Sequence, residues 1–89
     1  MNLKYKIMET VSSVDIDGQR YLMDSKTANY FSLDPISIYV WEMLKESNDF
    51  ETIVIRVVAE YNAQKEDVIV DIQSFIHDLI ENGLLKVVS

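Results

Sequence analysis

The sequence predicts an α+β protein in which a three-stranded antiparallel β-meander is followed by three helices. Apolar residues alternate with polar ones at period two in the first third of the chain, and they recur at helical spacing beyond residue 34. An Asp-Pro pair at residues 34–35 separates the two patterns. Because the chain has only 89 residues, 48% of them hydrophobic, we expect one globular domain spanning residues 1–89.

The first two strands of the meander are expected to form a hairpin. Val14 and Ile16 alternate with Asp15, and Asp17-Gly18 follows them as a two-residue turn signal. A second strand is then expected over residues 19–24. The same period-two alternation occurs closer to the N-terminus, at Leu3, Tyr5 and Ile7.

The third strand is expected over residues 28–33, after a polar turn at residues 24–27. Since side chains alternate between the two faces of a strand, Tyr30 is expected on one face and Phe31 and Leu33 on the other. This strand comes last in the meander, so we expect it at an edge of the sheet.

The first helix is predicted to start at the Asp-Pro pair. Asp34 is a preferred N-cap residue, and Pro35 at the first helical position loses only a donor that would have no partner there. The helix is expected to run to about Glu46. Its buried residues are expected to be Ile36, Val40, Met43 and Leu44.

Two more helices are predicted from capping signals and apolar spacing. Residues 48–51 offer a cap with a glutamate three positions on, and the second helix is expected to end near Asn62. The third is expected to begin at residues 65–67, where acids suit the positive end of the helix dipole, and to stop at Asn82-Gly83. A short apolar tail over residues 84–88 follows.

The composition argues against most enzymatic sites. There is no cysteine and only one histidine, so the chain contains neither a Cys-His pair nor a metal site with several histidines. Gly18 and Gly83 are 65 positions apart, which excludes a glycine-rich nucleotide-binding loop. His77 is interpreted as a solvated surface residue. We therefore expect a protein that is not an enzyme and needs neither a metal nor a cofactor.

The sequence gives no sign of export or membrane insertion. Charged residues interrupt the N-terminal segment, and no stretch approaches the ~18 apolar residues of a membrane span. We expect a cytoplasmic protein with no membrane partner.

Charge also bears on a nucleic-acid partner, because a β-meander with three helices can resemble a winged helix-turn-helix. The net charge is −7, and residues 35–89 hold ten acids against four bases. The third helix carries five acids against Lys65 alone, whereas DNA binding draws much of its affinity from cations that neutralise phosphates. We expect no nucleic-acid partner, and a winged-helix transcriptional regulator is the alternative interpretation.

The third helix has a wide apolar arc. At 100° per residue its apolar positions cover about 140°, against ~100° for an ordinary core-facing stripe. Asp67, Asp71 and Asp78 lie together beside the Phe75 edge of this arc. Two interpretations stay open: a deeply buried helix with solvated acids, or a helix whose Phe75 edge is the wall of a groove. The apolar positions are Val68, Ile69, Ile72, Phe75, Ile76, Leu79 and Ile80.

Four segments, each largely apolar and therefore uninformative alone, form a more specific pattern through their order and spacing. They are Tyr30 to Asp34 leading into Ile38 to Leu44, then Ile53 to Tyr61, then Asp71 to Leu79, and finally Gly83 to Leu85. Over residues 21–85 this combination resembles the PqqD-like family, the RiPP recognition elements that bind leader peptides of ribosomally made natural products. One departure is the turn at residues 24–27, which lacks the glycine that relatives often have.

The resemblance implies a winged helix-turn-helix arrangement in which a leader peptide adds as a strand along the third strand and lies against the third helix. Tyr30 to Leu33 match the strand wall, and Asp71, Phe75 and Leu79 match the helix pattern. With the neighbouring helix positions, the expected peptide-binding residues are Tyr30, Phe31, Ser32, Leu33, Val68, Asp71, Ile72, Phe75, Asp78 and Leu79.

The resemblance also implies two partners, a precursor peptide and a separate maturation enzyme. A leader peptidase of a lasso-peptide system is the first expectation, ahead of pyrroloquinoline quinone biosynthesis and radical-enzyme peptide systems. A fragment detached from a larger enzyme is a third interpretation of the chain, after the leader-binding protein and the transcriptional regulator. The acidic rim, Asp67, Asp71 and Asp78, is expected to select a leader with lysine or arginine beside its apolar anchors.

Overall fold

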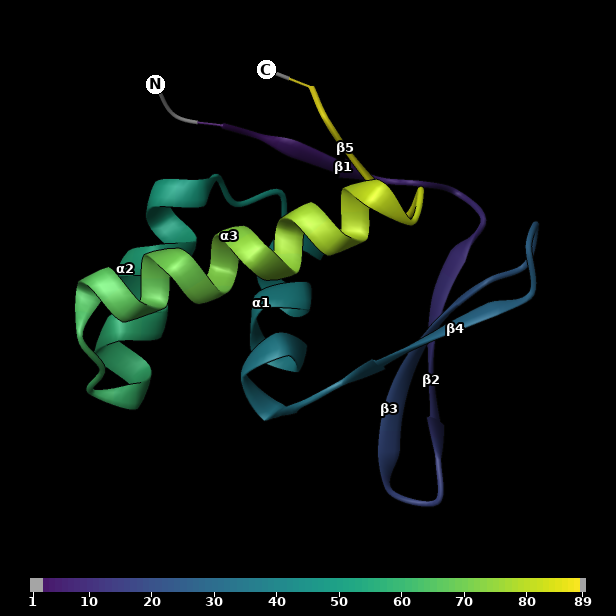
Figure 1. Ribbon diagram of the computed structural model, residues 1–89, viewed down its shortest axis with the longest axis horizontal. Coiled ribbons are helices and arrows are strands. Elements are labelled where there is room, and N and C mark those ends of the chain that lie inside the picture. The colour runs from purple at the N-terminus through teal and green to yellow at the C-terminus, as the bar shows by residue number, and fades with distance from the viewer. Residues whose placement is uncertain (1–2, 89) are drawn as a thin grey trace.

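The computed structural model describes residues 3–88 and combines two small antiparallel sheets with three helices (Figure 1). The three helices pack together, and the larger sheet lies to one side of them. In chain order the elements are β1 (Tyr5–Ile7), β2 (Val11–Ile16), β3 (Gln19–Asp24), β4 (Asn29–Leu33), α1 (Pro35–Lys45), α2 (Phe50–Tyr61), α3 (Lys65–Glu81) and β5 (Leu85–Val87).

The larger sheet is the predicted meander, with strand order β2-β3-β4 and β4 at an edge. Ile16 pairs with Gln19 across the β2–β3 turn. Both residues of that turn have positive φ, 51° at Asp17 and 81° at Gly18, as a two-residue hairpin loop requires. The expected hairpin is therefore confirmed.

The β3–β4 turn closes without a glycine. Ala28 takes the left-handed conformation, with φ 61°, and its N–H donates to the Asp24 carbonyl at 2.7 Å. The buried Asp24 carboxylate accepts from the Lys26 backbone N–H at 3.0 Å. A hydrogen bond from the Thr10 side chain, together with that from Lys26, lowers the pKa of Asp24. These bonds fix the register in which Asp24 pairs with Asn29.

Replacing Ala28 by glycine is expected to raise the free energy of unfolding by about 1 kcal/mol, because glycine adopts positive φ without the steric penalty that alanine incurs. Urea unfolding followed by the fluorescence of Trp41 measures this, since that ring is 2% exposed. Ala59→Gly is the matched control in the exposed face of α2. It is expected to lower stability by about 1 kcal/mol. If both substitutions were destabilising, the turn would not be strained at Ala28.

The helix termini follow the predicted signals, with one correction. The Asp34 carboxylate accepts from the Ser37 N–H at 2.8 Å, and the C-cap of α2 is Asn62, with φ 50°. The cap of α2 is Asp49, which accepts from the Thr52 N–H at 2.8 Å. Asn48, the residue three positions before the glutamate, instead donates its side-chain amide to the Met43 carbonyl.

The apolar tail forms part of a second sheet, which the local sequence pattern does not predict. β5 pairs antiparallel with β1, so Tyr5 faces Val87 and Lys6 faces Lys86. Further hydrogen bonds at both ends, Met8 N–H to the Leu84 carbonyl and Val88 N–H to the Lys4 carbonyl, extend the pairing. Figure 1 shows the two strands side by side next to the end of α3.

The core lies where α1, α2 and α3 meet the inner face of the meander. Its most deeply buried side chains are Trp41, Leu22, Leu33, Ile53, Leu79, Val40 and Val57. Val40, Met43 and Leu44 are buried as predicted, but Ile36 is 42% exposed, so its expected burial was wrong. Ile36 is on the core-facing side of α1, but it lies in the first turn, where the helix borders a surface cavity. Within residues 3–88 no helix is long and apolar enough to cross a membrane.

Candidate functional site

An open cavity of about 460 Å³ lies between β4, the first turns of α1 and the middle of α3. We call this cavity the cleft. Phe31 comes from the strand, and Asp71, Phe75 and Asp78 come from one face of α3. The other lining residues are Asp34, Ile36, Ser37, Val40, Ile72 and Ser74.

Two aromatic rings join the strand side of the cleft to its helix side. The centroids of Phe31 and Phe75 are 6.1 Å apart, with their planes inclined by 60°. Both side chains are half-buried and pack against the core. Phe75 is therefore partly a core residue and partly a wall of the cleft. The two interpretations of its helix edge are both partly correct.

The positions of the other apolar residues of α3 explain why its apolar arc is wide. Val68, Ile72 and Leu79 form the buried middle, while the opposite edge reaches Ile80, which is 38% exposed. Ile80 lines a different cavity, of about 220 Å³, together with Phe50. The arc exceeds an ordinary core stripe because its two edges border two separate cavities.

The cleft is acidic. Asp34, Asp71 and Asp78 line it, and no lysine or arginine does so among the residues that the structure describes. Asp34 is already a helix cap, whereas no ion pair within 4.0 Å is found for Asp71 or Asp78 over residues 3–88. Asp67 does not line the cleft, so the acidic rim of the cavity consists of Asp34, Asp71 and Asp78.

The structure brings together five of the residues expected to bind peptide: Phe31, Asp71, Ile72, Phe75 and Asp78 line the cleft. Three others are core residues, because Leu33, Val68 and Leu79 are 1%, 5% and 0% exposed. They support the walls of the cleft from beneath and offer almost no surface to a ligand.

The remaining two expected residues, Tyr30 and Ser32, lie on the sheet face opposite Phe31, as the alternation along β4 requires. The ring of Tyr30 is 59% exposed and makes an edge contact with Tyr21 on β3, with centroids 6.0 Å apart. The Ser32 hydroxyl accepts from the Gln19 side-chain amide at 2.9 Å. Their backbones belong to the edge strand, but their side chains point away from the cleft.

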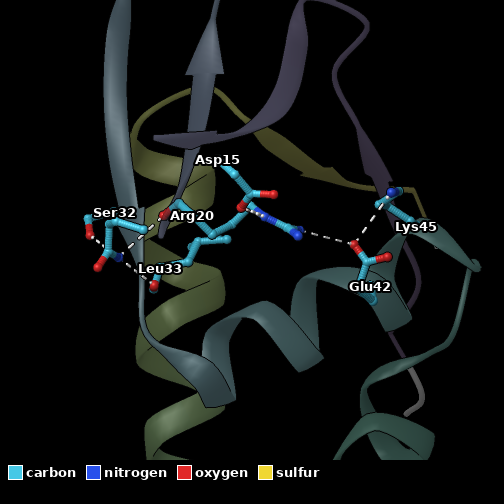
Figure 2. Close-up of polar contacts among 7 residues, drawn as sticks. Asp15, Arg20, Ser32, Leu33, Glu42 and Lys45 are labelled. Carbon is cyan, nitrogen blue, oxygen red and sulfur yellow. Dashed lines mark hydrogen bonds and ion pairs between the residues drawn. The ribbon is translucent and has the colours of Figure 1, made fainter. Parts of the chain in front are cut away.

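A polar network holds the end of β4 in place next to α1 (Figure 2). The Gln19 amide that bonds Ser32 also donates to the Leu33 carbonyl at 2.9 Å. Arg20 donates to Asp15 at 2.7 Å, and its guanidinium lies 3.8 Å from Glu42 on α1. The hydrogen bond to Asp15 is the main cause of the raised pKa of Arg20. Glu42 in turn lies 3.4 Å from Lys45. The contact between Arg20 and Glu42 links the sheet to α1.

The contribution of α1 is the part of the site that sequence reasoning missed. Asp34 and Ile36 were assigned to a helix cap and to the core, and both line the cleft. One signal was available, since a strand that runs directly into a helix at Asp34-Pro35 places the first helical turn beside the end of that strand.

The outer edge of β4 completes the site. In the described sheet, β4 pairs with β3 on one side and with no strand on the other. An edge strand presents unpaired N–H and C=O groups to which another chain can bond. Unpaired backbone groups of β4 and the side chains of the cleft thus belong to the same part of the molecule.

The fold and the cleft define a small α+β protein with an open sheet edge beside an acidic, aromatic-walled cavity. The sequence also identifies the family. Residues 19–85 match the family described as Coenzyme PQQ synthesis protein D (PqqD), and the chain belongs to this family. The resemblance to PqqD-like proteins is thereby confirmed. A comparison with curated proteins found no match.

Two solved structures share the fold. One, "TbiB1 in Complex with the TbiA(beta) Leader Peptide", has 33% sequence identity and a TM-score of 0.82, over 91% of this chain and 94% of the other. The second, "Lasso peptide synthetase B1 complexed with the leader peptide", has 20% identity and a TM-score of 0.83, over 92% and 96% of the two chains. The predicted α+β fold of three antiparallel strands followed by three helices is confirmed, and the winged helix-turn-helix designation stays a prediction.

Proposed function

We propose that this chain binds the leader segment of a ribosomally made precursor peptide as an added strand along β4, and presents it to a separate maturation enzyme without catalysing a reaction itself. The observation that carries the proposal is the open β4 edge next to the cleft. The relative at 33% identity is a complex with a leader peptide, which supports the same ligand class here. A lasso-peptide leader peptidase in the cytoplasm is the first candidate for the partner enzyme.

Backbone pairing alone does not account for useful affinity. Four or five hydrogen bonds along the edge contribute ~0.5 to 1.5 kcal/mol each, about 2 to 7 kcal/mol together, which at most offsets a typical part of the ~4 to 15 kcal/mol lost on association. Two or three apolar side chains buried in the cleft add ~1.5 to 3 kcal/mol each, so the net affinity depends mainly on these anchors. Phe75, Phe31 and Ile36 are the cleft residues that offer apolar surface for such anchors.

The acids of the cleft predict a leader with lysine or arginine beside its apolar anchors. A fluorescently labelled leader, taken from the precursor peptide encoded beside the gene, is titrated with the protein at low and high salt. We expect affinity to fall as salt rises, because ion pairs at the surface are screened. In Asp71→Asn/Asp78→Asn, affinity at low salt is expected to fall by roughly 3- to 10-fold, with a weaker salt dependence.

The matched control is Glu66→Gln/Asp67→Asn, which removes the same charge from the first turn of α3 outside the cleft. This control is expected to change affinity by less than about 2-fold, because exposed charges at a distance are screened. Equal effects of the two double variants would show that general charge, and not the cleft, attracts the peptide. A protein that binds no leader at all would contradict the proposed function.

A further inference from the structure

A second open cavity, of about 480 Å³, lies near the C-terminal end of α3. We call it the lysine pocket, because Lys6, Lys26 and Lys86 line it from β1, the β3–β4 turn and β5. These are three of the eight lysines and arginines in a chain whose net charge is −7. The pocket thus gathers positive charge in a protein that is acidic elsewhere.

The arrangement of these lysines is unfavourable without a ligand. Lys6 and Lys86 are directly opposite each other in the β1–β5 pair. Like charges in that position repel each other and destabilise a sheet. Over residues 3–88 no ion pair within 4.0 Å neutralises either one.

The acids in the pocket do not offset this charge fully. Glu9 and Asp24 are the two acids that line it. Asp24 is 4% exposed, and its carboxylate is already bonded by Thr10 and by the backbone of Lys26. An anionic group from outside the chain would relieve the remaining repulsion.

The lysine pocket is a separate cavity that lies beyond the cleft in the direction of the α3 C-terminus. Along α3, Asp78 lines the cleft and Asn82, about one turn later, lines the lysine pocket. Along the other wall, Phe31 lines the cleft and Thr27, four residues earlier, lines the pocket. A strand added to β4 therefore has an acidic cavity at one end and a basic one at the other.

The spacing of the two cavities predicts how many residues of a bound strand separate its contacts with them. Thr27 lies in the β3–β4 turn, so only Asn29 to Phe31 of this wall is extended, roughly 7 Å, and the pocket lies beyond the start of the strand. A peptide antiparallel to β4 has its C-terminal side toward Thr27, because β4 runs from Asn29 to Leu33. Its residue opposite the lysine pocket would lie beyond the one opposite Asn29, and so about four positions after an anchor in the cleft.

We infer that the lysine pocket binds an aspartate or glutamate side chain of the peptide held in the cleft, about four residues C-terminal to its apolar anchor. The inference rests on the proposed function and adds the charge pattern and the direction of the peptide. A cation beside the anchor at the acidic end and a carboxylate at the basic end fit the groove in one direction only. Reversing the peptide would place like charges together.

The test is a selection of displayed random 15-residue peptides against the full chain. We expect the selected peptides to share an apolar anchor with aspartate or glutamate enriched about four positions after it. One selected peptide is then labelled and its affinity measured with Lys6→Gln/Lys86→Gln. This variant is expected to bind roughly 3- to 10-fold more weakly, whereas Arg56→Gln/Lys65→Gln, an equal charge change outside both cavities, is expected to change affinity by less than about 2-fold.

Two further measurements separate binding from a structural role. The Lys6→Gln/Lys86→Gln variant is expected to be as stable as the parent or more so, since it removes a repulsive pair. Replacing the peptide's acidic residue by its amide is expected to abolish the difference between this variant and the parent protein.

The outcomes distinguish this inference from the proposed function. In one outcome, selected peptides lose affinity for Phe75→Ala yet show no acidic preference and bind Lys6→Gln/Lys86→Gln as tightly as the parent protein. That result would overturn the lysine pocket and leave leader binding intact. An acidic preference on the N-terminal side of the anchor would overturn the direction. Recovery of no peptide that depends on Phe75 would overturn both.

Discussion

Replacing Phe75 by alanine is expected to weaken leader binding by roughly 10- to 100-fold while the protein stays folded. The phenyl ring is half-buried, packs against Phe31 with the two ring planes inclined, and lines the cleft. Losing it removes ~1.5 to 3 kcal/mol of apolar burial from the complex, and each 1.4 kcal/mol is tenfold in affinity. Titration of the labelled leader measures the change, with Trp41 fluorescence reporting the folded fraction.

The matched control for this substitution is Phe50→Ala. Phe50 is also half-buried and packs against the core, but it lines the smaller cavity on the other side of α3. Both substitutions are expected to lower stability by a similar amount, and only Phe75→Ala is expected to weaken binding. If Phe75→Ala unfolded the protein yet left the affinity of the folded fraction unchanged, Phe75 would be a core residue alone.

Replacing Leu79 by alanine is expected to have the opposite profile, a large loss of stability with little change in affinity. Leu79 is 0% exposed and belongs to the core cluster, so truncation leaves a cavity that its neighbours cannot fill. Such substitutions lower the free energy of unfolding by ~2.7 to 5.0 kcal/mol. That is a large part of the ~5 to 15 kcal/mol that stabilises a typical domain. Urea unfolding measures the loss.

Ile80→Ala is the matched control for Leu79→Ala. It is the next residue on the same helix and is 38% exposed, so its truncation is expected to cost clearly less. Leader affinity is measured for both variants under conditions where they are folded. A loss of affinity in Leu79→Ala as large as that in Phe75→Ala would show that the peptide reaches Leu79 directly, and that the helix moves when it binds.

Most of the fold was predictable because its signals are local. Asp17-Gly18 specifies a hairpin whose two turn residues need positive φ, and Asp34-Pro35 specifies a helix start. Asn62 and Gly83 mark the ends of α2 and α3, both with positive φ. In each case the backbone geometry depends on residues within one turn, so no knowledge of distant contacts was required.

The elements that escaped prediction depend on distant partners. Residues 85–87 became a strand only because β1, nearly the whole chain away, supplies the other half of the sheet. The spacing of Ile36 gave the direction of its side chain correctly but not how far the core extends along α1. Periodicity determines which way a residue points and contains no information on what it meets there.

The sequence by itself determined the order of strands and helices, the acidic edge of α3 and the family to which the chain belongs. Only the tertiary structure decided which of the expected residues share a cavity: Phe31 and Phe75 meet at 6.1 Å, while Leu79 is enclosed and Tyr30 faces away. The reason is that a cleft forms between elements, so its walls depend on how β4, α1 and α3 pack. Propensity and spacing act along each element alone.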